Sequence, residues 1–186
     1  MKLALVLLLF AAPALAQNSP SQAQSSPQGP CGPEQTQFDV ERSSSHPSVQ
    51  AEPGKALIYI SEVFKKAAGE MGGDPTLRVA VDGEWVGAVK GNSSFAFSVE
   101  PGEHHLCVKW QSHFKRLSRE AAFTVFTAEA GKPYYFRARV NYDVAPSYGH
   151  TGNDITGMSI TLDAISPDEG QYLVGANPIS VPRQKK

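Results

Sequence analysis

The chain has 186 residues, with 17 lysines and arginines against 18 aspartates and glutamates, and a formal net charge of −1. This near-neutral balance argues against a nucleic-acid partner, because nucleic-acid binding usually requires a basic face. Without its N-terminal leader the chain has the length of one domain with tails.

Residues 1–16 have the pattern of a signal peptide. Lys2 gives a positive start, residues 3–12 form an apolar run, and residues 14–16 (Ala-Leu-Ala) match a cleavage site of small residues. The run is shorter than the roughly 20 residues that a membrane helix needs, so we expect cleavage after Ala16 rather than an uncleaved anchor. No later stretch resembles a transmembrane segment, and we expect an exported chain, periplasmic or secreted.

Residues 17–52 are rich in Ser, Gln and Pro, a composition that buries too little apolar surface to offset the entropy lost on ordering. We therefore expect a spacer, ordered only where Phe38 and Val40 alternate with polar neighbours. Cys31 in this spacer and Cys107 in the domain are expected to form a disulfide, as cysteine pairs in exported chains usually do. Two free thiols, one of them reactive, are the alternative.

The folded domain is expected over residues 53–176 and begins with a strand at residues 56–61. Residues 63–71 fit either a helical turn or a loop. Residues 76–111 then read as four short strands with alternating apolar positions. Their three reversals are marked by turn pairs: Asp82-Gly83, Gly91-Asn92 and Pro101-Gly102.

A longer hairpin is expected at residues 121–129 and 134–142. One face of its second strand carries Tyr134, Phe136, Ala138 and Val140, and the other carries Tyr135, Arg137, Arg139 and Asn141. This alternation is typical of a half-buried antiparallel strand.

Residues 143–157 are rich in Gly, Pro and Asn and are predicted to form a long loop before a last strand at Met158–Leu162. Ser166, followed by proline and two acidic residues, predicts the start of a short helix. Residues 177–186 are predicted to be a flexible tail.

Roughly seven short strands separated by turn signals predict a single antiparallel β-sandwich, immunoglobulin-like or transthyretin-like, with a short C-terminal helix. Cys107 is out of phase with Leu106 and Val108, so its side chain should leave the core face. The disulfide would then fasten the spacer to the outside of a sheet or along an edge.

Two motifs resemble those of a known family. V-x-V-D-G-x-x-V-G begins at Val79, and F-x-F-x-V-x-P-G-x-H-x-L-x-V begins at Phe95. With the strand Pro53–Tyr59, they resemble a family of uncharacterised bacterial envelope domains, many of them lipoproteins, and are similar to PEGA-type surface domains. The resemblance runs to about Val174 and implies a β-sandwich with no assigned enzyme chemistry. Unlike the lipoprotein members, this chain lacks a lipidation cysteine at the cleavage site.

The sequence offers no convincing catalytic, metal or cofactor site. Asp82 is interpreted as a hairpin corner, because Asp and Gly tolerate positive φ. His104 and His105 are adjacent, so on a strand they point to opposite faces and cannot chelate one ion together. A nucleophile elbow is missing, and a thiol nucleophile at Cys107 competes with the disulfide. We therefore expect that the protein is not an enzyme.

A possible binding surface is formed by Trp85, Arg137, Arg139, Tyr142 and Tyr148. Tyr and Trp favour interfaces, and long loops on β scaffolds often carry function. The alternative is that the aromatic residues pack in the core and the arginines belong to a solvated sheet face.

The sequence thus predicts a non-catalytic exported envelope module that binds or scaffolds another envelope component, either a protein or part of the cell wall. The alternative is a small-ligand or glycan-binding sandwich that uses the 143–157 loop and its aromatic residues.

Overall fold

The computed structural model describes residues 31–46, 49–64, 74–112, 117–149 and 153–186. This part of the chain contains ten strands, one α-helix and a short 3-10 helix. The strands are β1 (Phe38–Ser43), β2 (Ala56–Phe64), β3 (Thr76–Val81), β4 (Glu84–Lys90), β5 (Ser94–Val99), β6 (Gly102–Trp110), β7 (Ala121–Ala128), β8 (Pro133–Pro146), β9 (Asn153–Ala164) and β10 (Ile179–Gln184). The helices are η1 (Leu117–Arg119) and α1 (Pro167–Ala176).

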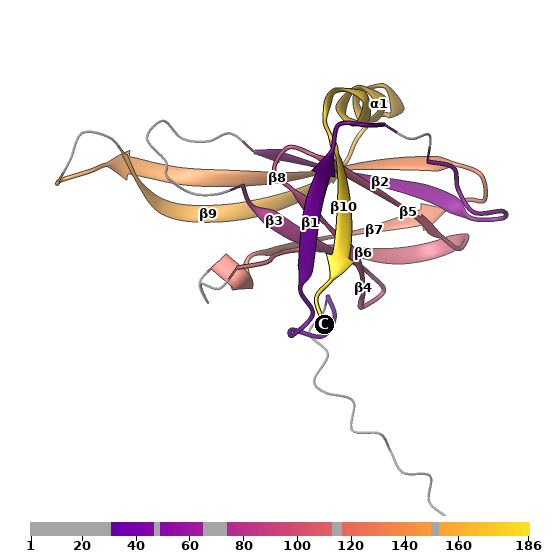
Figure 1. Cartoon of the computed structure of the whole chain (residues 1–186), viewed down its shortest axis with the longest axis horizontal. Helices are drawn as coiled ribbons and strands as arrows, with labels where there is room; N and C mark the ends of the chain where they lie inside the picture. The colour runs from indigo at the N-terminus through magenta and orange to yellow at the C-terminus, as the bar shows by residue number, and fades with distance from the viewer. Residues whose placement is uncertain (1–30, 47–48, 65–73, 113–116, 150–152) are drawn as a thin grey trace, which may run out of the picture.

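The strands form two sheets (Figure 1). The six-stranded sheet has the order β1-β10-β5-β2-β8-β9, and the four-stranded sheet has the order β4-β3-β6-β7. Every neighbouring pair in the smaller sheet is antiparallel, but β10 runs parallel to β5 and β2 runs parallel to β8. The prediction of purely antiparallel sheets is therefore wrong for these two pairs. No tight hairpin joins them, so no turn signal in the sequence shows their direction.

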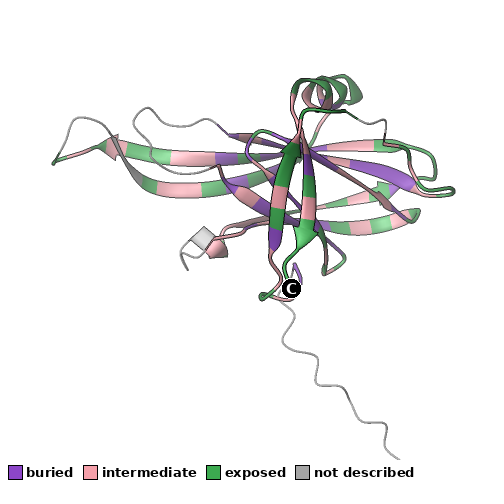
Figure 2. Cartoon of the chain, in the orientation of Figure 1, coloured by how far each residue is buried: buried purple, intermediate pink, exposed green. Residues whose placement is uncertain are grey.

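Both sheets contribute to one hydrophobic core. Ile58, Ile60 and Phe136 from the larger sheet share this core with Val79 and Leu106 from the smaller one, and all five are buried. Burial alternates along β7 and the middle of β8, because successive side chains point to opposite faces, whereas β2 and β3 are buried along most of their length (Figure 2).

Several local expectations are confirmed. Asp82 and Gly83 have φ angles of 53° and 82°, the two positive values that a tight hairpin corner requires. The side chain of Ser166 caps α1 by accepting a hydrogen bond from the Glu169 N–H at 3.2 Å. Gly170 lets the helix approach the sheet, because a Cβ there would lie 2.2 Å from the ring of Tyr135.

The expectation of a flexible tail at residues 177–186 is wrong. Residues 179–184 form β10, which pairs with β1 over six residues and lies between β1 and β5. The Oγ atom of Ser180 accepts a hydrogen bond from the Lys90 N–H at 3.0 Å and contacts the Ser93 hydroxyl at 2.6 Å. The sequence does not indicate this strand, because the strand has no run of apolar residues. Backbone pairing and serine contacts hold it in place instead.

The expectation of a long loop at residues 143–157 is also wrong over most of its length. β8 continues to Pro146 and β9 begins at Asn153, with a β-bulge between Asp143 and Val144. The described side chains of this ribbon are not part of the hydrophobic core, so the ribbon needs no apolar alternation and its sequence reads as a loop. Near the start of the domain, β2 reaches Phe64, whereas the rest of the ambiguous 63–71 segment lies outside the described residues.

Candidate functional site

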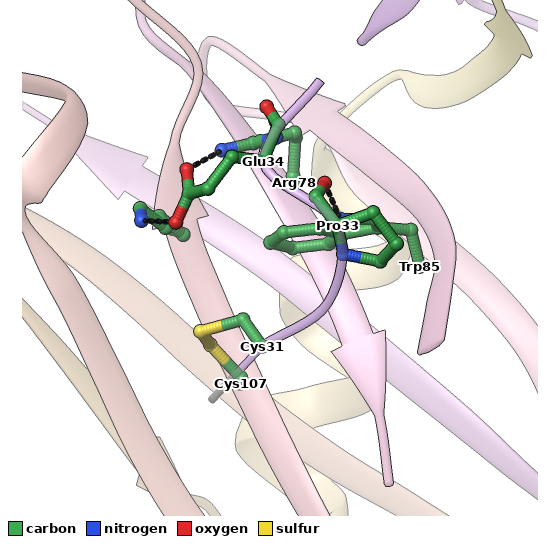
Figure 3. The surroundings of a disulfide bond; sticks show 7 residues. Cys31, Pro33, Glu34, Arg78, Trp85 and Cys107 are labelled. Atoms are coloured by element: carbon green, nitrogen blue, oxygen red, sulfur yellow. Dashed lines mark hydrogen bonds and ion pairs between the residues drawn. A yellow bond between two sulfur atoms is a disulfide. The ribbon is translucent and has the colours of Figure 1, made fainter. Parts of the chain in front are cut away.

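The disulfide between Cys31 and Cys107 fastens residues 31–36 to the outer face of the four-stranded sheet (Figure 3). Both cysteines are buried in a small cluster around Ala80, separate from the main core, with Trp85 packed against it. The predicted pairing is thus confirmed, and so is the prediction that Cys107 leaves the core face. We call residues 31–36 the stapled segment.

The buried side chain of Arg78 binds the backbone of the stapled segment. Arg78 donates hydrogen bonds to the backbone carbonyls of Thr36 at 2.7 Å and Glu34 at 3.2 Å. Its guanidinium lies 4.3 Å from the centre of the Trp85 ring, whose indole N–H donates to the Pro33 carbonyl at 2.8 Å. Burial lowers the pKa of Arg78, and the charge of Glu34 only partly opposes this effect. Trp85 is therefore half-buried under the stapled segment and is not open as part of the predicted binding surface.

His104 and Asp82 join the turns at one end of the smaller sheet. The Nδ1 atom of His104 lies 2.7 Å from Asp82 Oδ2, and its Nε2 atom lies 2.7 Å from the Glu100 carbonyl oxygen. Burial alone would lower the pKa of His104, but the hydrogen bonds to Asp82 and Glu100 outweigh it and raise the pKa. When the ring is protonated, both nitrogens donate to these acceptors, so neither is open to a substrate or a metal.

A second buried ionisable side chain lies on the core face of β2. Glu62 is fully buried; its Oε2 accepts the Gly91 N–H at 2.9 Å, and its Oε1 has no hydrogen-bond partner among the described residues. Burial raises the pKa of Glu62 well above its ordinary value. Nearby, Arg42 donates to the Gly91 carbonyl at 2.9 Å and pairs with Asp74 at 2.8 Å. The sequence did not single out Glu62, although its strict alternation with Ile60 indicates the core face.

The two predicted arginines lie on the outer face of the six-stranded sheet. Arg137 contacts Glu169 of α1 and lies 3.8 Å from Asp163 of β9, so it ties the helix to two strands. Arg139 is two residues further along β8 and is exposed. Of these two, Arg139 is the one that is open to a partner.

Beyond the core, β8 and β9 continue as a two-stranded ribbon, which we call the arm and define as residues 143–149 and 153–157. The described pairing of β8 with β2 ends at Val140, and from there β8 pairs with β9 (Figure 1). Tyr142 lies at the base of the arm and packs edge-on against Trp110, with ring centres 6.4 Å apart. Val144 is 46% exposed and Tyr148 is fully exposed.

The arm has a defined local structure at its bulge. The Thr156 hydroxyl donates to the Asp143 carbonyl at 3.2 Å. Gly157 lies against the Asp143 carboxylate, and a Cβ at this position would be 2.5 Å from Oδ2. The bulge therefore requires glycine at position 157 or a shift of the Asp143 side chain.

The five residues of the predicted surface do not form one site. Trp85 lies on the outer face of the smaller sheet, Arg137 and Arg139 on that of the larger sheet, Tyr142 against the core and Tyr148 on the arm. Only Arg139 and Tyr148 are exposed.

An apolar strip on β7 did not stand out in the sequence. Phe123 and Val125 are 56% and 53% exposed on the outer face of this strand. They line a shallow pocket together with His105 and Cys107. The apolar pattern of β7 does not indicate which of its faces is exposed, because the opposite face also carries a large apolar residue, Phe126.

Searches of protein-family models, curated proteins and solved structures found no match for this chain. Within the described residues, no helix is long and apolar enough to cross a membrane. The same residues contain no group of three or more His, Cys, Asp or Glu side chains that could hold a metal ion.

Proposed function

We propose that this chain is an exported, non-catalytic envelope module that binds or scaffolds another envelope component. The arm is the observation that carries this proposal. A two-stranded ribbon is marginally stable alone, and three strands or a packed face are normally needed. The arm leaves the core yet presents Val144 and Tyr148 to solvent, so a partner that packs on it would supply the missing support.

Other features support the envelope location and the fold. The Cys31–Cys107 disulfide is the kind of bond that persists in oxidising compartments, whether periplasmic or extracellular. Two sheets around one core support a β-sandwich of immunoglobulin-like or transthyretin-like type. The motifs that resemble bacterial envelope and PEGA-type domains occupy turns and core positions in this fold, such as Asp82-Gly83 and Val108.

The arm gives less support to a glycan or small-ligand site. Such a site would use the two tyrosines beside the 143–157 segment as a pair. Tyr142 packs toward the core, so Tyr148 is left as the exposed aromatic residue among the described positions of the arm. A single exposed ring favours contact with a protein surface over a ligand pocket.

Photo-crosslinking in intact cells tests the proposal. A photoreactive phenylalanine analogue replaces Tyr148, and a matched control replaces Tyr172, which is 72% exposed on α1. We expect a discrete adduct with one envelope component from position 148 and none from position 172. No adduct from position 148, or the same adducts from both positions, would overturn the assignment of the arm.

The non-catalytic part of the proposal has its own test. The purified exported chain is assayed against a panel of esters, peptides and cell-wall fragments, and we expect no turnover. Turnover that a single substitution abolishes would refute it.

A further inference from the structure

Hydrogen bonds from side chains join the turn between β4 and β5 to the first and last strands of the described chain. We define this β4–β5 turn as residues 90–93. The Lys90 N–H donates to the Ser180 hydroxyl of β10 at 3.0 Å. The Gly91 carbonyl accepts a hydrogen bond from the Arg42 guanidinium of β1 at 2.9 Å. Both β10 and β1 are therefore bound to this turn, in addition to their pairing with each other.

The same turn is bound to β2. The Phe64 N–H donates to the Asn92 side-chain oxygen at 2.9 Å, and the Glu62 N–H donates to the Ser93 carbonyl at 2.9 Å. The Gly91 N–H donates to Glu62 Oε2 at 2.9 Å. The φ angles of Gly91 and Asn92 are 54° and 46°, positive values that are typical of a tight hairpin corner. The turn therefore lies against the buried Glu62 carboxyl.

The Glu62 carboxyl is poorly placed to carry a charge. The residue is fully buried, and its Oε1 atom has no hydrogen-bond partner among the described residues, although an ionised carboxyl can accept about four hydrogen bonds. The charged groups that act on it are Arg42 and Asp74, which pair with each other at 2.8 Å. On β8 the residue opposite is Ala138, which is uncharged. Burial with so little pairing favours the uncharged acid.

We propose that the β4–β5 turn is a pH-sensitive switch, closed over the uncharged Glu62 carboxyl and opened locally when this carboxyl gives up its proton to water. Opening lets water reach both carboxylate oxygens, which the closed turn does not satisfy. It also breaks the bonds of the turn to Ser180 and Arg42, so β10 and β1 lose their attachment to it. The switch thus couples one buried carboxyl to both terminal strands.

The direction of the pH dependence follows from the two states of Glu62. In the open turn the carboxyl is hydrated and has its ordinary pKa near 4.5, whereas burial in the closed turn raises the pKa well above that value. Between these two pKa values the opening equilibrium should rise about tenfold per pH unit. Above the raised pKa it should level off, because both states are then ionised.

Amide hydrogen exchange, followed by NMR on the purified, disulfide-bonded chain at a series of pH values, tests the inference. The reporters are the N–H groups of Phe64, Lys90 and Gly91, which the turn binds. After correction for base-catalysed exchange, we expect their protection to fall about tenfold per pH unit above pH 4.5. Low concentrations of urea should leave this exchange unchanged, because a local opening exposes little surface. The amides of β6, which pairs on both sides, should be better protected and respond to urea.

Two substitutions show whether Glu62 is the group that titrates. Glu62→Gln should make the protection of the three reporters independent of pH. Glu41→Gln is the matched control, because Glu41 is an exposed glutamate of β1 that pairs with Arg183 at 3.2 Å, and it should preserve the native pH dependence. Circular dichroism and a count of free thiols verify that each variant is folded with its disulfide intact.

Three results would each overturn the proposal. In the native chain, the reporters could show the same protection and urea dependence as the β6 amides, which would mean that they exchange only by global unfolding. Glu62→Gln could keep the native pH dependence, or Glu41→Gln could remove it. The proposal rests neither on the arm nor on an envelope location, so crosslinking at Tyr148 can fail while the switch persists.

Discussion

Removal of the disulfide gives the sharpest test of how the N-terminal segment stabilises the fold. Cys31 and Cys107 are 76 positions apart. In the chain-entropy model, opening a loop of this size returns about 15 cal/mol/K to the unfolded chain, which is about 4.5 kcal/mol at 25 °C. We therefore expect the double variant Cys31→Ala, Cys107→Ala to lose between about 2 and 5 kcal/mol of unfolding free energy.

The variant should nevertheless remain folded, because other bonds keep the segment in place. Gln111 accepts the Phe38 N–H at 2.7 Å and donates to the Phe38 carbonyl at 2.8 Å, and β1 stays paired with β10. Urea denaturation of the native and double-variant chains measures the loss. The slope of the transition should rise, because the unfolded chain exposes more surface without the cross-link. A loss below about 1 kcal/mol would refute the view that the bridge restricts the unfolded state.

Three further substitutions, two of them with a matched control substitution, test the buried and paired ionisable groups. Arg78→Met should lower the unfolding free energy by about 2–4 kcal/mol, since two carbonyls lose a charged donor. Arg139 is exposed, so Arg139→Met should change the unfolding free energy by less than about 0.5 kcal/mol. Equal losses for the two variants in urea denaturation would contradict this expectation. Burial would lower the pKa of His104, but its hydrogen bonds outweigh burial and raise the pKa. Its contribution to the unfolding free energy is at most about 1 kcal/mol. This contribution is complete below pH 6.5 and is lost as the pH rises through the raised pKa. His104→Asn should remove this pH dependence and His105→Asn should preserve it, as denaturation at a series of pH values will show. Burial raises the pKa of Glu62 well above 4.5, so the unfolding free energy of the native chain should fall as the pH rises above that value. Glu62→Gln should therefore be more stable than the native chain near neutral pH. A less stable Glu62→Gln variant would contradict the raised pKa of Glu62.

Features of the fold that depend on one residue type were predictable from the sequence. The Asp82-Gly83 corner follows from the positive φ that few other residues tolerate. The helix start follows from Ser166 and the proline after it. The outward direction of Cys107 follows from the two-residue period of a strand, as does the core face of β8.

Features that depend on contacts between distant segments were not predictable. Arg78 occupies an outward position on β3, and it is buried only because the stapled segment lies over it. The parallel pairing of β2 with β8 and the insertion of β10 involve strands that no turn connects. The same limit applies to the candidate site. Strand alternation shows which face of a sheet a side chain occupies, but it does not show whether another segment covers that face. The burial of Trp85 under the stapled segment could therefore not be predicted.

The position of β10 has a consequence for the order in which the fold assembles. Among the described strands β1 is the earliest in the chain, and its strand partner there is β10, the latest. The segment synthesised first therefore cannot complete its pairing until the segment synthesised last has arrived. Contacts of this sequence separation slow folding, so we expect β1 to be among the last strands to join the larger sheet, whatever the order in which the core of the two sheets forms.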